Sequence, residues 1–176
     1  MATTYHKHVE RLFTPEECSR LRQKGLEGDL KVERATVGGG RDIKEGLRRS
    51  YVTWLPKDTP ELQKVRAAMH AYAAECRLSS RYEFEFQLTR YDGTDNGVYG
   101  WHMDCGEHED NQRVVSCSVM LSDPHEFDGG ELRFQALGRV PPDLKIGDAA
   151  VFRSWLCHRV EPVTRGRRWS LVSWMR

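Results

Sequence analysis

Two copies of one short pattern, His-x-Asp, lie close together in the chain. The first occupies residues 102–104 (HMD) and the second occupies residues 108–110 (HED). In an extended segment, residues two apart project from the same face, so either pair could supply two ligands to one metal ion. The pattern is short enough to arise by chance, and its surroundings must therefore distinguish a metal site from a polar loop.

The surroundings favour the first copy. The aromatic run YGW precedes His102 and is typical of a strand that ends inside a core, whereas His108 and Asp110 lie in the wholly polar stretch GEHEDN. A third ligand is available at His158, which follows the predicted strand DAAVF. Two histidines and one carboxylate leave three positions open on non-haem Fe(II). We therefore predict that His102, Asp104 and His158 are the metal ligands and the catalytic residues, and that the second copy is a polar loop at the rim.

An arginine downstream has the chemistry to complete this site. Arg168 comes ten residues after His158, beyond the segment TRG (164–166), which predicts a turn onto the next strand. Arginine binds carboxylates through two parallel N–H donors, and Ser170 shares its strand face while Arg167 points to solvent. We expect Arg168 to hold one end of a dicarboxylate whose other end chelates the metal, with Ser170 adding a hydroxyl.

The elements that must position these residues are mostly strands. From residue 81 onward, short alternating or apolar runs such as YEFEFQLTRY, RVVSCSVMLS and DAAVFRS are separated by turn signals. This spacing is typical of an all-β sandwich or a double-stranded β-helix of the jelly-roll type.

Two helices are predicted upstream of the strands. The first starts at Thr14-Pro15, with Glu17 completing a capping box. The second covers residues 59–78, with Thr59 as its cap and an apolar stripe at spacings of three and four. The predicted fold class is therefore α+β. It has a double-stranded β-helix (jelly-roll) core over about residues 81–176, helical support in residues 1–80 packed outside, and one domain across residues 1–176.

Composition excludes some classes of partner. The net charge is +1 over 176 residues, so binding to nucleic acid is not expected. No apolar run is long enough to span a bilayer, and the five cysteines form no CxxC pair. We expect a reduced, cytoplasmic protein with no membrane association, whose oligomeric state is open.

Three segments together resemble a known family. The segments LTRYDGTDNGVYGWHMD, VMLSDPHEFDGGEL and GDAAVFRSWLCHRVEPVTRGRRWSLVSW are similar to the prolyl-4-hydroxylase-like branch of the Fe(II)/2-oxoglutarate-dependent dioxygenases, and above all to the bacterial PKHD-type hydroxylases. The resemblance covers residues 81–176. It implies iron on the three predicted ligands, O2 as oxidant, and the distal carboxylate of 2-oxoglutarate on Arg168. Tyr91 matches a tyrosine that commonly helps to hold 2-oxoglutarate in this family, and Tyr99 is a second candidate.

The resemblance also implies the reaction. An aliphatic carbon would be hydroxylated, with succinate and CO2 as co-products, and the retained Asp104 favours hydroxylation over halide transfer. The substrate is either a peptidyl proline or other protein side chain, or a free amino acid or small metabolite. Trp155 and Arg49 are candidate substrate contacts, and residues 38–46 and 105–113 are candidate lids. The alternative outside enzymes is a β-barrel sensor or binding module that keeps the metal without turnover.

Overall fold

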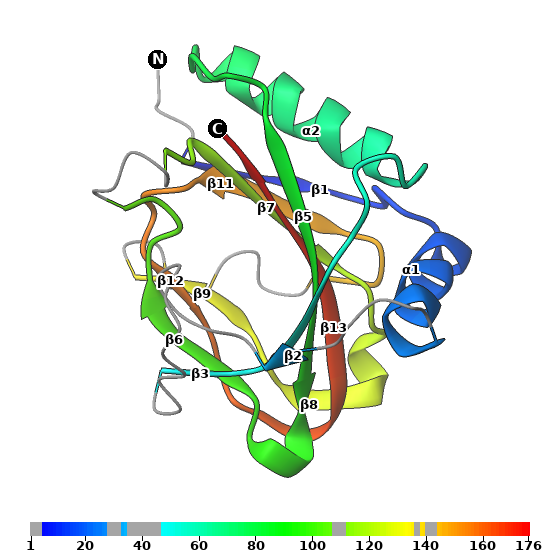
Figure 1. Ribbon diagram of the computed structural model, residues 1–176. Coiled ribbons are helices and arrows are strands. Elements are labelled where there is room, and N and C mark those ends of the chain that lie inside the picture. Colours follow the sequence, from blue (N-terminus) through cyan, green and yellow to red (C-terminus); the bar gives the residue numbers. More distant parts are fainter. Residues whose placement is uncertain (1–4, 28–32, 35–46, 107–111, 136–137, 140–143) are drawn as a thin grey trace.

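The structure, a computed structural model, describes residues 5–27, 33–34, 47–106, 112–135, 138–139 and 144–176 (Figure 1). Its body consists of two antiparallel sheets. The larger sheet has the order β1 (His6–Val9), β11 (Ala149–Arg153), β7 (Val115–Met120), β13 (Val163–Met175), β5 (Phe84–Asp92), β4 (Tyr51–Trp54) and β2 (Glu33–Arg34), and β8 (Phe127–Gly129) also pairs with β13. The smaller sheet has the order β10 (Gly138–Arg139), β9 (Leu132–Phe134), β12 (His158–Val160), β6 (Val98–His102) and β3 (Arg48–Arg49). Short 3-10 helices at Gly93–Asp95 and Pro124–Glu126 complete the described elements.

Helices α1 (Pro15–Glu27) and α2 (Leu62–Glu75) cover the outside of the larger sheet, as Figure 1 shows. This arrangement confirms the predicted α+β class with a jelly-roll core and external N-terminal helices. Within the described residues, no helix has the length and apolar content that a membrane span requires.

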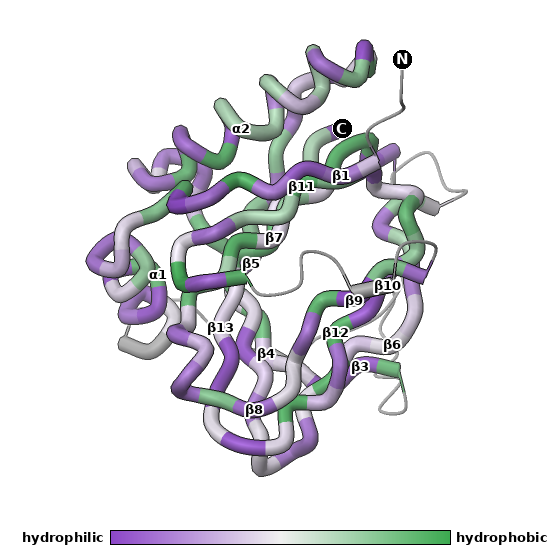
Figure 2. The backbone as a smooth tube through the Cα atoms, turned by 180° about the vertical axis from the view of Figure 1, so that it is seen from behind, coloured by the Kyte–Doolittle hydropathy of each residue, from purple (hydrophilic) through white to green (hydrophobic). Residues whose placement is uncertain are grey.

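Alternation along the strands produces two separate cores. On β5, Phe84, Phe86 and Leu88 pack with the helices, while Tyr91 belongs to the second core between the sheets. Apolar residues gather along β5, β7 and β11 in the tube view of Figure 2, whereas the helices alternate between polar and apolar residues. The buried stripe of α2 contains four of the five predicted residues, Leu62, Val65, Met69 and Tyr72, whereas the fifth, Cys76, is the C-cap residue and is only partly buried. The sheet thus isolates a helix-facing core from an inner face that is available for chemistry.

The first helix begins as its sequence predicts. The Glu17 amide donates to Thr14 Oγ1 at 3.3 Å, and the Thr14 amide donates to Glu17 Oε2 at 2.9 Å, which is a reciprocal capping box. Its last turn passes close to β13, because Gly25 leaves room for the Trp169 ring.

The predicted cap of the second helix is wrong. The helix begins at Leu62 with Glu61 as the N-cap residue, and no side chain caps it. Thr59 is used in a preceding turn instead, where its amide donates to the Pro56 carbonyl and its carbonyl accepts from Leu62. Glu61 pairs with Arg20 of α1 at 3.1 Å, so this end of α2 is held by a contact between the helices.

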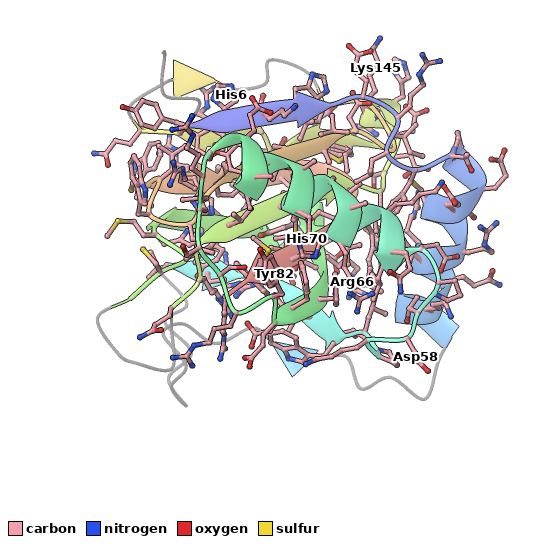
Figure 3. The ribbon with its side chains drawn as sticks, turned by 90° about the horizontal axis from the view of Figure 1, so that it is seen from above. His6, Asp58, Arg66, His70, Tyr82 and Lys145 are labelled. Carbon is pink, nitrogen blue, oxygen red and sulfur yellow. The ribbon has the colours of Figure 1, made fainter. Side chains whose placement is uncertain are left out.

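His70 lies on the helical side of the larger sheet. Figure 3 shows it projecting from α2 beside Tyr82, and its ring centroid lies 4.8 Å from that of Tyr82 and 5.2 Å from that of Phe84. His70 is therefore a packing residue.

The predicted turn at residues 164–166 is also wrong. Strand β13 continues through this segment, and the chain also runs through Glu161–Pro162 without a turn, because residues 158–163 keep one antiparallel register with residues 129–134. Gly166 has φ +68°, and a Cβ there would lie 1.9 Å from the Glu126 carbonyl oxygen. The glycine therefore permits an irregular pairing of β13 with β8, in which Gly166 lies opposite Phe127. Arg168 is placed by a continuous strand rather than by a hairpin.

Candidate active site

The three predicted metal ligands meet at one point. His102 ends β6, Asp104 follows it in a bend, and His158 begins β12 directly opposite His102 in the smaller sheet. One ligand atom from each residue lies within 4.8 Å of the others. His102 Nε2 is 3.6 Å from Asp104 Oδ1, and His158 Nε2 is 3.5 Å from Asp104 Oδ2. Strand pairing therefore brings together side chains that are more than fifty residues apart.

Backbone carbonyls fix the orientation of both imidazoles. His102 Nδ1 lies 2.8 Å from the Gly100 carbonyl oxygen, and His158 Nδ1 lies 2.8 Å from the Leu156 carbonyl oxygen. Because a carbonyl only accepts, each Nδ1 carries the proton and each Nε2 presents a lone pair toward Asp104. Burial lowers the pKa of His158 to about 4, so this ring is neutral at physiological pH and suited to bind a metal.

Asp104 supplies the negative charge of the site. Burial alone would raise the pKa of this carboxyl, but its interactions with His158, His102 and Ser116 outweigh burial and hold the pKa well below its usual range. The carboxyl group is therefore ionised.

The donor set fits Fe(II). It consists of two imidazole nitrogens and a carboxylate, without a thiolate. The distances from the two Nε2 atoms to the Asp104 oxygens, 3.6 and 3.5 Å, are shorter than the sum of two metal–ligand bonds of about 2.1 Å each, so one ion can contact all three residues. With three protein ligands on one side, an octahedral ion keeps three positions for other molecules.

Arg168 lies buried on β13 beside Ser170. Its side chain is only 1% exposed, and its Nη1 donates to Ser170 Oγ at 3.2 Å. Its Cζ lies 5.5 Å from the centroid of the Tyr91 ring, and its Nε has no hydrogen-bond partner within the described part of the chain. Burial lowers the pKa of Arg168, but a guanidinium remains charged at neutral pH. The charge of Glu131 acts on this buried cation, and a bound carboxylate would compensate it further.

Gly130 of the DGGEL motif makes room for this arginine. Its φ is +69°, and a Cβ there would lie 2.7 Å from Arg168 Cδ and 2.8 Å from Val163 Cγ2. The residue thus combines a backbone conformation that favours glycine with a close approach to the arginine side chain.

Tyr91 lies beside Arg168, and Tyr99 lies beside the ligand His102. Tyr91 is 2% exposed, and the charges of Arg48, Arg168 and Asp104 all act on it, although burial is the main reason that its pKa is raised. The Tyr99 ring stacks on His102 with centroids 3.5 Å apart, and burial raises the pKa of Tyr99 to about 12. Both phenols are therefore neutral and able to donate hydrogen bonds.

The candidate substrate contacts lie farther out. Trp155 is half-exposed and meets Tyr5 edge to face at 5.5 Å, which places an aromatic pair on the segment leading to His158. Arg49 is exposed and donates to the Asn96 carbonyl at 3.1 and 3.3 Å. The second His-x-Asp copy, most of the 105–113 loop and the proposed lid at 38–46 lie outside the described residues.

Sequence reasoning did not identify several buried polar residues around the site. Arg48 lies 4.4 Å from the Tyr99 centroid and donates to Ser50 Oγ and Gln87 Oε1. The Ser116–Ser154 pair, with its hydroxyls 2.9 Å apart, was missed altogether. A polar residue at every second position of VVSCSVM was the available signal, since it places Ser116 and Ser118 on the inner face of β7.

Known proteins match both the sequence and the fold. The family model described as the 2OG-Fe(II) oxygenase superfamily matches residues 86–176, just over half of the chain. A PKHD-type hydroxylase of Janthinobacterium sp. (strain Marseille) is 28% identical over 185 residues, an alignment that covers 96% of this chain and 76% of that protein.

Solved structures extend the likeness over nearly the whole chain. A Pseudomonas putida prolyl-4-hydroxylase superposes with a TM-score of 0.72 at 26% identity, covering 99% of this chain and 94% of the other. The viral collagen prolyl hydroxylase vCPH from Paramecium Bursaria Chlorella virus-1, in its 2OG complex, gives a TM-score of 0.71 at 23% identity, covering 98% and 96%.

Proposed function

Since the chain belongs to the 2OG-Fe(II) oxygenase superfamily and is an enzyme that uses Fe(II), 2-oxoglutarate and O2, we propose that it hydroxylates an aliphatic carbon and releases succinate and CO2. The PKHD-type relatives and the prolyl-4-hydroxylase structure support the resemblance to the PKHD branch that the sequence indicates. The reaction outcome and the roles of individual residues are proposals.

In this mechanism, His102, Asp104 and His158 hold Fe(II), which supplies the reductive activation of O2 when it is bound. The two carbonyl-bound Nδ1–H groups keep both Nε2 lone pairs directed at the ion before it arrives. Arg168 and Ser170 bind the distal carboxylate of 2-oxoglutarate. This contact positions the other end of 2-oxoglutarate relative to the iron ligands.

The two tyrosines have separate tasks. Tyr91, beside Arg168, donates to 2-oxoglutarate through its neutral phenol. Tyr99 covers one face of the His102 ring and keeps water from that side of the ligand. Trp155, farther out, contacts the substrate.

The observation that carries the proposal is the pairing of a facial triad with a buried, charged Arg168. A protein that only binds a metal does not require a buried arginine that can bind a carboxylate, and burial of such a cation costs free energy that a bound anion offsets. The pairing therefore favours the enzyme over the sensor or binding module.

Anaerobic titration tests the cosubstrate site directly. Adding 2-oxoglutarate to the Fe(II)-loaded protein should produce a weak visible charge-transfer band, which His102→Ala should abolish and His70→Ala should leave intact. His70 is a suitable control because it is a histidine on the far side of the larger sheet. Absence of the band in the wild-type protein would overturn the proposal.

The substrate class requires a separate screen. A structural neighbour from Trichoplax adhaerens is a prolyl hydroxylase in complex with a hypoxia inducible factor peptide fragment, which at 15% identity is a likeness of fold alone. We propose a peptidyl proline or another protein side chain as the first class to test, and a free amino acid or small metabolite as the second. Succinate release above the uncoupled rate, with gain of one oxygen atom in the candidate by mass spectrometry, identifies the substrate. Release that no candidate stimulates, even with the charge-transfer band present, would count against both classes.

A further inference from the structure

Three side chains of the smaller sheet lie in one stack that ends at a proposed metal ligand. The Tyr99 ring lies against the His102 imidazole with centroids 3.5 Å apart and planes 13° apart. Arg48 Cζ lies over the same phenol ring, 4.4 Å from its centroid. Because an imidazole at 3.5 Å leaves no room for a second group on that face of the ring, the guanidinium covers the opposite face. The phenol ring is therefore held between a cation and the imidazole.

An irregularity in β6 brings Tyr99 and His102 to the same side of the sheet. His158 of β12 pairs with His102 and Val160 pairs with Tyr99, so two residues of β6 lie opposite the single residue of β12 between these pairs. In a regular strand, residues three apart point to opposite faces, whereas one extra residue returns them to the same face. The stack thus depends on a β-bulge next to the site.

Strand pairing and hydrogen bonds fix the guanidinium. Arg48 of β3 lies directly opposite Tyr99 of the neighbouring β6 (Figure 1), so their side chains share one face of the sheet. Arg48 Nε donates to Ser50 Oγ at 2.9 Å, and its Nη2 donates to Gln87 Oε1 at 3.1 Å. Arg48, Ser50 and Gln87 are all buried. Since Gln87 belongs to β5, Arg48 connects the stack to the larger sheet.

The stack supplies a constraint that the hydrogen bond of His102 lacks. The Nδ1–H group donates to the Gly100 carbonyl at 2.8 Å, and one hydrogen bond fixes a direction but not the plane of the ring. His158 meets the imidazole at 4.2 Å with the planes 53° apart, so this contact is not parallel to the ring. Parallel stacking on Tyr99 fixes the plane, and the attraction of the Arg48 cation to the ring face holds Tyr99 in place.

We propose that Arg48 is a positioning residue that acts through Tyr99 to hold the His102 imidazole in the orientation that binds the metal. This inference rests on the proposed role of His102 as a metal ligand. Without the cation, Tyr99 can move away from the imidazole, and the His102 ring can tilt so that its Nε2 lone pair no longer points at the ion. Outer-shell partners of metal ligands typically change metal affinity or activity by roughly 10- to 100-fold.

Binding of Mn(II), followed by calorimetry in the absence of O2, tests this role on the full-length protein without turnover. Arg48→Met keeps a long side chain but removes the cation, and should weaken Mn(II) binding roughly 10- to 100-fold. Tyr99→Leu removes the ring and should weaken binding at least as much. The double variant should be no worse than Tyr99→Leu, because Arg48 acts through the ring. Tyr99→Phe keeps the ring and should retain the wild-type affinity for Mn(II).

The direction of the effect separates positioning from a simple effect of charge. Arg48 is a positive charge near the proposed ligands, so its removal should by itself strengthen the binding of a metal cation. Weaker binding by Arg48→Met therefore reports the orientation of His102. NMR of the ring nitrogens in the metal-free protein gives a second readout. His102 should show the single tautomer protonated at Nδ1 in the wild-type protein, and a mixture of tautomers in Arg48→Met.

Arg90→Met is the matched control. Arg90 Cζ lies 4.5 Å from the centroid of the Tyr51 ring and also over Trp169, in the helix-facing part of the larger sheet. The variant loses a similar contact between a cation and a ring, and should bind Mn(II) as the wild-type protein does. If Arg48→Met does not fold, as its melting temperature shows, Ser50→Ala decides the question, because it removes only one acceptor of the guanidinium. It should weaken Mn(II) binding by a smaller factor, and unchanged binding would contradict the role of Arg48.

Three results would count against different statements. If Arg48→Met and Arg90→Met bind Mn(II) alike while His102→Ala loses the metal, the positioning role is wrong and the proposed ligand set stands. If the effects of Arg48→Met and Tyr99→Leu simply add in the double variant, Arg48 does not act through Tyr99 and the inference again fails. If His102→Ala itself binds Mn(II) as tightly as the wild-type protein, both the ligand set and the inference are wrong.

Discussion

Replacing Gly130 with alanine should impair both the stability of the protein and its affinity for 2-oxoglutarate. The new Cβ would lie 2.7 Å from Arg168 Cδ and 2.8 Å from Val163 Cγ2, at a residue whose φ is +69°. Relief of the contact requires the chain or the arginine to shift. Because Arg168 is 1% exposed, its side chain cannot move out to solvent, and a shift within the core would change the position of the proposed carboxylate contact.

The expected magnitudes follow from these two defects. A non-glycine residue in the left-handed region costs about 1–2 kcal/mol, and overpacking a filled interior costs about 1–3 kcal/mol. The free energy of unfolding should therefore fall by about 2–5 kcal/mol, which for a chain of this size lowers Tm by roughly 4–20 °C. Losing one hydrogen bond between the displaced guanidinium and a carboxylate costs about 1.5–3 kcal/mol, or roughly a 10- to 100-fold increase in the Kd for 2-oxoglutarate.

The assay measures Tm by circular dichroism and the 2-oxoglutarate Kd of the Mn(II)-loaded protein below the melting range. Gly25→Ala provides a matched control, because its Cβ would lie 2.9 Å from the Trp169 ring in the helix-facing core and would not touch Arg168. It should lower Tm without changing the Kd. If Gly130→Ala binds 2-oxoglutarate as tightly as the wild-type protein despite a lowered Tm, then the position of Arg168 does not control the cosubstrate and our reasoning is refuted.

Three further predictions concern other residues. Arg168→Lys keeps the charge but loses the planar pair of donors, and should raise the KM for 2-oxoglutarate at least tenfold, measured by succinate release; an unchanged KM would argue against a bidentate contact. His102→Ala should abolish Fe(II) binding by calorimetry whereas His108→Ala should preserve it, and equal losses would contradict the choice between the two His-x-Asp copies. Thr14→Ala removes the hydroxyl that accepts from the Glu17 amide and should lower the free energy of unfolding by about 1 kcal/mol without altering turnover, so a change in kcat would show that the cap acts beyond stability.

Patterns confined to a few neighbouring residues predicted the fold class and the candidate ligands. Alternation in YEFEFQLTRY marks β5 and its two faces, because side chains in a strand alternate whatever the rest of the chain does. The capping box at Thr14 and Glu17 is equally local, since both partners lie within one helical turn. The imidazole of His102 and the carboxylate of Asp104 can bind a metal in any fold, so the residue types alone indicate them as candidate ligands. The DGGEL and HRVxPVTRGxR segments, in that sequence order, indicated the family.

Other features depended on contacts between distant segments, and the sequence misassigned or missed them. Thr59 has the chemistry of a cap, but the turn from Pro56 uses it instead. Gly166 has the conformational freedom of a turn residue, yet pairing of β13 with β8 uses that freedom for an irregularity within a strand. The local sequence shows which structural roles a residue can take, whereas its contacts in the folded protein decide which of these roles it takes.

The site itself is a product of tertiary structure. Pairing of β12 with β6 places His158 opposite His102, and the carbonyl of Ser154, which follows β11 of the other sheet, accepts from the Asp104 amide. The amino-acid sequence determined which groups were available for binding a metal and a carboxylate. Only the closure of the two sheets decided which of them meet, because hydrogen bonds and metal ligation act over a few ångströms and the chain separates these residues by tens of positions.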